Sequence, residues 1–515
     1  MPPTRRDFLA RTGLAGAALA LGRAGAQPAR RPNLLVIHTD EHSIRTLGCY
    51  RALLPPEQAF VWGPGVAVET PHIDWLARNG AVCERFYATS PVCTPSRAAF
   101  VSGRYPQNTG ALVNDRPLRD EVVTFAEVLR RAGYATGYAG KWHLDGPARP
   151  GWAPARRFGF SDNRYLFNRG HWKQLAEDDR GPRVGATNAQ GQPTYAVVGA
   201  NDKSFTTDFL ADRAVRFIQE HRDQPFCYMV SLPDPHGPNT VRAPYDTMFD
   251  KLPFQQPRTA KEKGTDLPGY AATQPDRFNV AQMARYFGMV KCIDDNVGKI
   301  LAALRAAGVL EQTYVVFTSD HGDMCGEHGR HNKSIPADGS ARVPFVLYAP
   351  GAVQPGTVVR PALGGVDFKP TILALLGVAS TNDEGRDFSP LLRGRDAPWR
   401  DAPWQDVSFL RIGGDNAGWL AACTQRHKLI VSPVDDPSLF DVERDPDELT
   451  NLWRRPEARE TVRTLGRELR RYVTQHKDPH GASPAVQADL AWACEGTGAY
   501  VAPRRPKRAV GAEEE

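Results

Sequence analysis

The sequence predicts an α/β fold with a large, mostly parallel β-sheet flanked by helices. Three apolar runs of strand length occur at residues 33–40, 226–231 and 314–320, and polar or charged side chains follow each run. Continuous apolar runs of this length are typical of strands that are buried on both faces of a parallel sheet. Amphipathic helical patterns lie between the runs, and this alternation favours parallel strand pairing.

The intervening helices have recognisable sequence signals. Thr124 and Glu127 form a capping box, and a further strand is expected at 134–140 after that helix. Apolar residues at helical spacing predict two longer helices, around 210–218 and 283–304. Ligands of such folds bind beyond the carboxyl ends of the strands. The chemically active side chains that follow the strands should therefore converge: Asp40, Lys141, His143, His236 and Asp320.

Four parts are expected along the chain. They are an export signal, a catalytic α/β domain, a smaller C-terminal α+β subdomain and an extended tail, at residues 1–26, 27–385, 386–475 and 476–515. The subdomain is expected to contain short strands followed by a helix at about 457–475. Two stretches rich in Pro, Gly, Arg and Asp, 147–204 and 237–276, are predicted to be long loops over the ligand-binding edge.

The N-terminal segment predicts export. Arg5 and Arg6 precede a short apolar stretch that ends in Ala24-Gly25-Ala26, which is typical of a twin-arginine signal with a cleavage site. We therefore expect a periplasmic or secreted protein, and no later apolar stretch is long enough to span a membrane. The formal charge of +6 over 515 residues is too small to indicate a nucleic-acid partner, and none is expected.

The eight cysteines lack the spacing of a zinc site. An oxidising destination permits disulfides, and Cys49–Cys83 and Cys423–Cys494 are conceivable pairs. The sequence alone does not assign them.

Cys93, Pro95 and Arg97 form a C-x-P-x-R motif at the start of a predicted helix. Proline favours the first helical turn, and the N-terminus of a helix attracts anions. By itself the motif is weak, because a free cysteine is more often an ordinary buried thiol. In the same way, an acid after a strand, such as Asp40, is often only a cap or turn residue, and His236 alone could be a loop residue.

In this context the sequence resembles the sulfatase family of the alkaline phosphatase superfamily, whose signature is C-x-P-x-R followed by a helix. Other landmarks occur in the family's order, at residues 32–40, 70–77, 137–143, 320–323, 326–329, 342–344 and 439–446. The resemblance covers about residues 32–452 and implies an alkaline-phosphatase-like fold.

The resemblance implies that Cys93 is oxidised to Cα-formylglycine by a formylglycine-generating enzyme before export. One hydroxyl of the aldehyde hydrate would attack sulfur and expel the alcohol. The other hydroxyl would then lose its proton, so that the aldehyde re-forms and sulfate leaves.

The family pattern also implies roles for five other residues. Arg97 would anchor the hydrate, and Lys141 would neutralise hydrate and sulfate oxygens. His143 would be the base of the second step. His236 and Lys333 would bind sulfate and protonate the leaving oxygen.

A divalent cation is expected to hold and polarise the sulfate oxygens. Its implied ligands are Asp40, Glu41, Asp320 and His321. Glu41 stands where Asp is usual in the family, and His321 stands where Asn is often found. Carboxylate ligands suit Ca²⁺, which is the first expectation although imidazole favours transition metals, and Mn²⁺ and Mg²⁺ stay open.

The expected activity is hydrolysis of an organic sulfate ester, with a carbohydrate sulfate as the favoured substrate. Trp152, Tyr165 and Trp172 could stack on sugar rings, or could equally form the core of the loops. An aryl or choline sulfate would need the same catalytic centre, and so would a phosphonate monoester or phosphodiester. An unmodified Cys93 would instead leave an anion- or glycan-binding protein.

Overall fold

The computed structural model describes residues 31–262, 264–269, 278–393, 406–413 and 418–506. The export signal expected at 1–26 lies outside these residues. The described residues from Pro32 onward form one compact unit. Within the described part of the chain, no helix is both long enough and apolar enough to cross a membrane.

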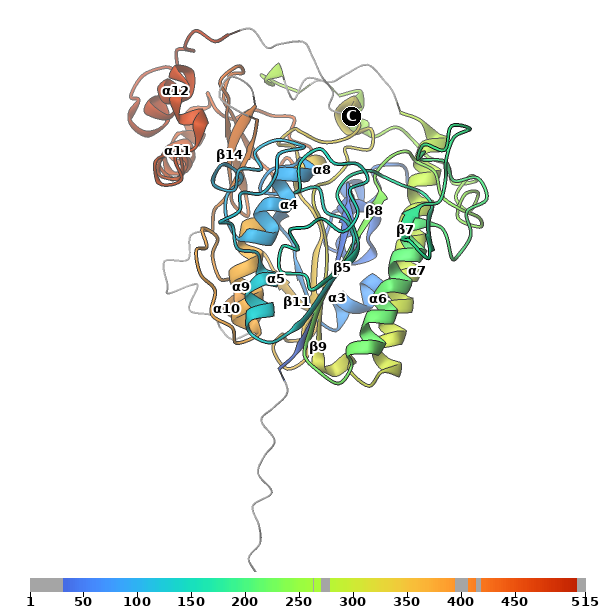
Figure 1. Ribbon diagram of the computed structural model, residues 1–515. Helices are drawn as coiled ribbons and strands as arrows, with labels where there is room; N and C mark the ends of the chain where they lie inside the picture. The colour runs from blue at the N-terminus through green and yellow to red at the C-terminus, as the bar shows by residue number, and fades with distance from the viewer. Residues whose placement is uncertain (1–30, 263, 270–277, 394–405, 414–417, 507–515) are drawn as a thin grey trace, which may run out of the picture. The chain divides into compact units, whose positions relative to one another are not determined.

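The centre of this unit is an eight-stranded sheet with the strand order β11-β2-β10-β9-β1-β8-β4-β5 (Figure 1). Only β10 runs antiparallel to its neighbours, β9 and β2. The expected mostly parallel sheet is thus confirmed. The strands, in chain order, are β1 (Asn33–Asp40), β2 (Ala81–Cys83), β4 (Ala135–Lys141), β5 (Asp162–Phe167), β8 (Phe226–Pro235), β9 (Thr313–Ser319), β10 (Phe345–Tyr348) and β11 (Thr357–Val359).

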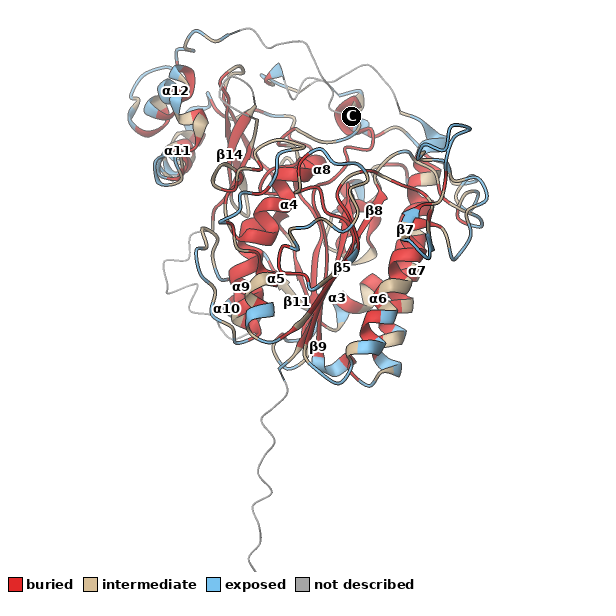
Figure 2. Ribbon diagram, in the orientation of Figure 1, coloured by how far each residue is buried: buried red, intermediate tan, exposed pale blue. Residues whose placement is uncertain are grey.

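Helices cover both faces of the sheet, as Figures 1 and 2 show. Alternate residues of β1 enter different cores: Leu34 and Val36 belong to one, Leu35 and Ile37 to the other. The first core includes α4 (Cys93–Ser102), α5 (Phe125–Arg131), α9 (Phe368–Leu375) and α10 (Ser389–Leu392). The second includes α3 (Pro71–Arg78), α6 (Thr206–His221) and α7 (Val280–Ala306). This two-sided burial explains the continuous apolar runs in the sequence.

The smaller C-terminal part is a four-stranded antiparallel sheet with two helices. One face of the sheet packs on the helices through residues such as Leu420 and Leu469. The opposite face packs on the segment that contains Met324 and Ile335. The elements are β13 (Ser408–Ile412), β14 (Trp419–Cys423), β15 (His427–Val431), β16 (Ser438–Asp441), α11 (Arg459–Gln475) and α12 (Pro484–Glu495).

Apart from single 3₁₀ turns, the remaining short elements of the described residues are two strand pairs and three short α-helices. They are β3 (Phe86–Tyr87) with β12 (Leu363–Gly364), β6 (Leu175–Asp178) with β7 (Gly181–Val184), α1 (Gly48–Arg51), α2 (Pro56–Ala59) and α8 (Asp338–Ala341).

The prediction that 147–204 is loop was wrong in part, because β5 lies there and forms the edge of the main sheet. An edge strand pairs on one side only, and this one begins with three polar residues, Asp162, Asn163 and Arg164, so it lacks the apolar run of a central strand. The same stretch contains the β6–β7 hairpin.

The tail expected from residue 476 is also different, because 484–495 form α12. Ser483 caps this helix, and Val486, Leu490 and Ala493 are buried at helical spacing. The final charged segment, 507–515, lies outside the described residues.

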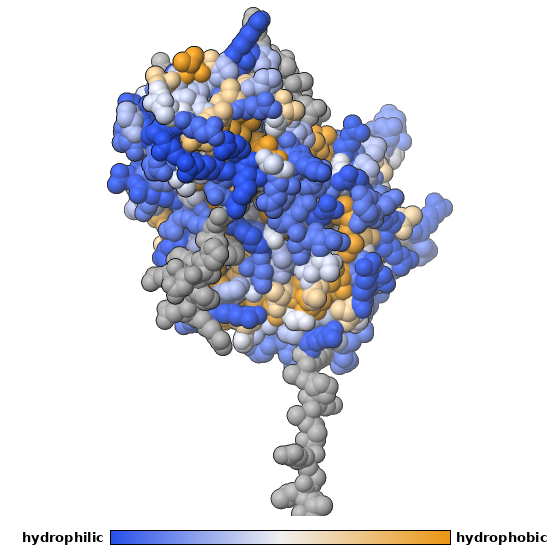
Figure 3. Space-filling view, turned by 90° about the vertical axis from the view of Figure 1, so that its left-hand side faces the viewer, coloured by the Kyte–Doolittle hydropathy of each residue, from blue (hydrophilic) through white to orange (hydrophobic). Residues whose placement is uncertain are grey.

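All eight cysteines are free thiols, so neither conceivable disulfide is formed. On the outside, hydrophilic residues dominate the face seen in Figure 3, with smaller groups of apolar residues between them.

Candidate active site

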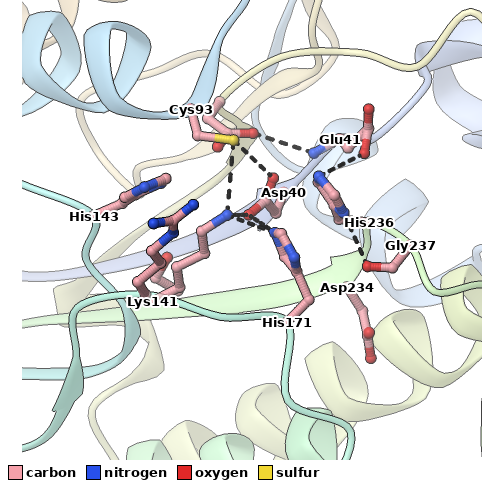
Figure 4. A network of polar contacts seen from close by, with 12 residues as sticks. Asp40, Glu41, Cys93, Lys141, His143, His171, Asp234, His236 and Gly237 are labelled. Atoms are coloured by element: carbon pink, nitrogen blue, oxygen red, sulfur yellow. Dashed lines mark hydrogen bonds and ion pairs between the residues drawn. The ribbon is translucent and has the colours of Figure 1, made fainter. Parts of the chain in front are cut away.

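The expected convergence at the strand ends is present in the structure. Asp40 is the last residue of β1, and Asp320 directly follows β9, with which β1 pairs in parallel register. Lys141 ends β4, and its Nζ forms an ion pair with Asp40. All three side chains are at most 1% exposed. Parallel strands thus bring two carboxylates and an ammonium group to one edge of the sheet, and Figure 4 shows Lys141 beside Asp40.

Cys93 is the first residue of α4 and points into this cluster. Its Sγ lies 3.2 Å from His321 Nε2, 3.7 Å from Lys141 Nζ and 3.8 Å from Asp40 Oδ1. The helix N-terminus provides further positive potential at this position. Burial raises the pKa of the Cys93 thiol above its usual value.

Arg97 lies one helical turn after Cys93 and binds both strand-end acids. Its Nε donates to Asp320 Oδ2 at 2.9 Å, and its Nη2 donates to Asp40 Oδ2 at 3.2 Å. Nη1 donates to Lys141 O and Ser231 Oγ, each at 2.8 Å. The guanidinium group is therefore occupied in fixing the carboxylates.

The charge of Asp40 follows from these partners. Burial would raise the pKa of its carboxyl group, but Lys141, a hydrogen bond from His171 and Arg97 together hold it well below the usual range. Asp40 is therefore a stable anion.

Four of these side chains fit a cation site. One ligand atom from each lies within 4.8 Å of the others, and all four residues are buried: Asp40, Cys93, Asp320 and His321. Two carboxylates and an imidazole are ligands that Ca²⁺, Mn²⁺ or Mg²⁺ use, although imidazole suits the transition metal best.

Glu41, the fourth expected metal ligand, lies apart from this group. Its backbone has φ 63°, in the left-handed region, while its N–H donates to Asp320 Oδ1 at 3.1 Å. Its carboxylate lies 3.3 Å from Lys333 Nζ and 3.0 Å from His236 Nε2. Burial, opposed by the charge of Lys333, raises the pKa of Glu41 to about 8.

His236 and Lys333 form the side of the site opposite His143. Lys333 Nζ lies 2.8 Å from His236 Nε2, and His236 Nδ1 lies 2.9 Å from Gly237 O. A carbonyl oxygen only accepts hydrogen bonds, so Nδ1 carries the proton. Burial, with the charges of His171 and Lys333, lowers the pKa of His236 well below its usual value.

The segment that carries Lys333, residues 329–336, is the lysine loop. Asn332 and Ser334, on either side of Lys333, both have positive φ, at 62° and 80°. Trp419 Nε1 of β14 donates to Ser334 O at 3.1 Å, and Lys428 Nζ of β15 donates to the loop's Pro336 O at 2.8 Å. The small C-terminal sheet therefore holds an unusual backbone conformation that places Lys333 in the site.

His143 lies on the Cys93 side of the cluster (Figure 4). Its Nε2 lies 3.0 Å from Asp115 Oδ1, and burial followed by the charges of Lys141 and Arg97 lowers its pKa well below the usual value. Asp115 was not among the residues predicted from the sequence, because it has no motif of its own.

His171 is a second residue that the sequence did not reveal. Its Nε2 lies 2.7 Å from Lys141 Nζ, and its ring stacks on that of His236 with centroids 3.6 Å apart. It lies in the stretch predicted to be loop, where no periodicity or motif distinguishes it. The three aromatic residues considered for sugar stacking lie differently: Trp172 and Tyr165 are buried, and Trp152 packs on Phe167.

Comparison with known proteins agrees with this arrangement. The Sulfatase family model matches residues 32–378, and the model of the C-terminal part of N-sulphoglucosamine sulphohydrolase matches residues 326–475. The chain is 28% identical over 458 residues to an ulvan-active sulfatase of Formosa agariphila, covering 87% of this chain and 82% of the other. It is 27% identical over 466 residues to a choline-sulfatase of Rhizobium meliloti, covering 83% of each.

Solved structures share the fold. One, in complex with its substrate D-glucosamine-2-N,6-O-disulfate, has a TM-score of 0.71 at 22% identity and covers 88% of this chain and 100% of its own. The phosphonate monoester hydrolase of Agrobacterium radiobacter has a TM-score of 0.68 at 24% identity, covering 87% and 96%. Because the family model spans more than half of the chain, this protein belongs to the sulfatase family, whose enzymes hydrolyse sulfate esters.

Proposed function

We propose that this sulfatase hydrolyses carbohydrate sulfate esters with a formylglycine derived from Cys93. The observation that carries the proposal is the position of Cys93, which opens α4 and lies within 4 Å of Lys141, Asp40 and His321. Conversion of the side chain would supply an aldehyde hydrate whose hydroxyl is the nucleophile.

Asp40, Asp320 and His321 are the proposed protein ligands of a divalent cation, together with the side chain at position 93. When bound, the cation would polarise the sulfate oxygens and offset negative charge in the transition state. We propose Ca²⁺ first, with Mn²⁺ as an alternative because of His321 and Mg²⁺ as an alternative because of the two carboxylates. We do not propose Glu41 as a ligand of this cation, because its carboxylate contacts Lys333 and His236.

The remaining side chains divide the work of charge and proton transfer. Arg97 fixes Asp40 and Asp320 in place, and we propose that it also anchors the hydrate at position 93. Lys141 supplies positive charge beside residue 93, where hydrate and sulfate oxygens would lie. A neutral His143 is suited to accept the proton of the second step.

The pair of Lys333 and His236 is suited to the leaving group. Lys333 donates toward His236 Nε2, and His236 lies across the cluster from His143 (Figure 4). We propose that this pair binds the ester sulfate and protonates the departing alcohol oxygen.

A carbohydrate substrate is favoured by the resemblance to an ulvan-active sulfatase and to a structure that holds a sulfated glucosamine. The second candidate is a phosphonate monoester or phosphodiester. It is favoured by the Asp320-His321 pair, in which the imidazole would suit a transition metal, and by the fold shared with a phosphonate monoester hydrolase.

We also propose that the protein is exported by the twin-arginine route after folding. Maturation of Cys93 by a formylglycine-generating enzyme would precede export. The Arg5-Arg6 segment supports this route.

Matched substrates test the function. Purified protein matured in a host with formylglycine-generating activity would be assayed on sulfated saccharides, 4-nitrophenyl sulfate, choline sulfate, phenyl phosphonate esters and phosphodiesters. We expect the highest kcat/KM on a saccharide sulfate. Turnover of a phosphonate ester or phosphodiester far above that of every sulfate would contradict the proposal.

A further inference from the structure

Asp115 and Arg169 lie beside the proposed base, His143, and neither has a role so far. His143 Nε2 lies 3.0 Å from Asp115 Oδ1, and Arg169 Nη1 lies 2.7 Å from Asp115 Oδ2. The three side chains thus form a chain of contacts in which one carboxylate connects a guanidinium group to an imidazole.

The hydrogen-bond chemistry of this chain determines where the imidazole carries its proton. A carboxylate accepts hydrogen bonds and an arginine only donates them, so Nε2 of His143 must carry the hydrogen that Asp115 accepts. Nδ1 of His143 is buried and has no hydrogen-bond partner among the described residues. The free lone pair of the ring is therefore on Nδ1.

Local backbone structure holds both residues next to Cys93. Thr94, the neighbour of Cys93, donates from its N–H to Asn114 Oδ1 at 3.1 Å and from its hydroxyl to His143 O at 2.9 Å. Asp115 and His143 have positive φ, at 63° and 62°. Such conformations persist in non-glycine residues where the surrounding structure enforces them, often at functional sites.

We propose that Asp115 is a positioning residue that fixes His143 in the Nε2-protonated tautomer, so that Nδ1 accepts the proton in the second step, and that Arg169 orients Asp115. This inference rests on the proposed function of His143 as a base. When Nδ1 accepts a proton, the ring becomes a cation, and the carboxylate stabilises it without taking the proton itself.

Replacement of Asp115 by Asn gives a specific prediction. Arg169 would attract the amide oxygen, which leaves the NH₂ group facing His143. That group would donate to Nε2 and force the hydrogen onto Nδ1, the wrong tautomer. Replacement by Gly removes the carboxylate without this reversal, and Gly suits the positive φ at position 115.

The experiment measures kcat and KM on 4-nitrophenyl sulfate with matured protein. This substrate has a good leaving group, so the step that needs His143 limits kcat. We expect Asp115→Asn and Asp115→Gly each to lower kcat by roughly 10²–10³-fold and to lower KM in proportion, because the intermediate before the limiting step accumulates, so that kcat/KM changes less than about threefold. Added formate should partly restore Asp115→Gly, because the Asp115 side chain is 30% exposed and the vacated position is open to solvent. Formate should not restore Asp115→Asn.

A matched control separates the positioning role of Asp115 from an effect on stability. Asp120→Gly removes a fully exposed carboxylate in the same loop and should leave kcat unchanged. Loss of kcat in Asp115→Gly without any formate rescue, or retention of kcat within threefold in Asp115→Asn, would overturn the inference.

A spectroscopic measurement is independent of turnover. In the ¹⁵N spectrum of histidine-labelled protein, with His143 assigned from His143→Gln, we expect protonated Nε2 and unprotonated Nδ1. A proton on Nδ1 would overturn the inference. If the matured wild-type protein hydrolysed no sulfate ester, the proposed function would fail while this spectrum still decided the tautomer.

Discussion

The site has two halves that are built differently. The strand-end group, Asp40, Lys141 and Asp320, lies at the ends of parallel strands, and its side chains are at most 1% exposed. The loop group consists of Asp115, Arg169 and His171, which lie in connections between helices and strands. Its side chains are more accessible: Asp115 is 30%, Arg169 32% and His171 18% exposed.

The two groups differ in their tasks: the strand-end group places charges, and the loop group is suited to contact the substrate. Regular strands fix charged groups in a dry environment, where their interactions with a sulfate group are strongest. Connections can vary without disturbing the sheet, so they are suited to orient the base and to contact the rest of the substrate. If this division holds, changes in the strand-end group should lower turnover by orders of magnitude, whereas changes in the loop group should do so only where they disturb the proposed base, His143.

The largest effect is expected from removal of the cation proposed at the strand ends. Dialysis of the active enzyme against a chelator should lower kcat by roughly 10³-fold or more, because this cation would supply several kcal/mol of transition-state stabilisation. Adding back Ca²⁺, Mn²⁺ and Mg²⁺ singly, followed by activity and metal analysis, identifies the ion. Full activity in protein shown by elemental analysis to be free of metal would contradict the assignment.

Much of the strand-end group could be predicted from the sequence, because an apolar run that stops at an acid specifies both a buried strand and the position of its end. The loop group could not be predicted in the same way. Asp115 and His171 are brought to the site by tertiary packing of segments without periodicity, and the side-chain direction of Glu41 depends on one positive φ. The edge strand β5 was missed because it lacks a continuous apolar run.

The next largest effect is expected at Lys141. Lys141→Met should lower kcat by roughly 10²–10³-fold, because it removes the positive charge next to Asp40 and residue 93. Thermal unfolding checks that the variant folds. Lys203→Met, which changes an exposed lysine, is the control and should keep full activity. A loss below tenfold would contradict a dominant contribution of the strand-end group to kcat.

A smaller effect is expected at His171 in the loop group. His171→Phe keeps a ring to stack on His236 but removes the contact with Lys141 Nζ. Loss of one hydrogen bond of about 1 kcal/mol should lower kcat/KM by about fivefold. His221→Phe, a ring stacked on Phe217 in α6, is the control. A loss as large as that of Lys141→Met would contradict this minor role of His171.

The smallest effect is expected where the C-terminal sheet supports the lysine loop. Trp419→Phe removes the hydrogen bond from Nε1 to Ser334 O and should lower kcat about two- to threefold, because Lys333 is held less firmly. Trp453→Phe is a matched control, since Trp453 is also buried but its Nε1 has no hydrogen-bond partner among the described residues. Equal kcat values for the two variants would contradict a supporting role of the sheet.

The central claim is that residue 93 works as a formylglycine, and the mass of the tryptic peptide Phe86–Arg97 tests it most directly. In active protein from a host with formylglycine-generating activity, we expect this peptide to lack the cysteine sulfur and two hydrogens and to carry one additional oxygen. Full catalytic activity in protein whose peptide contains only unmodified Cys93 would contradict the account.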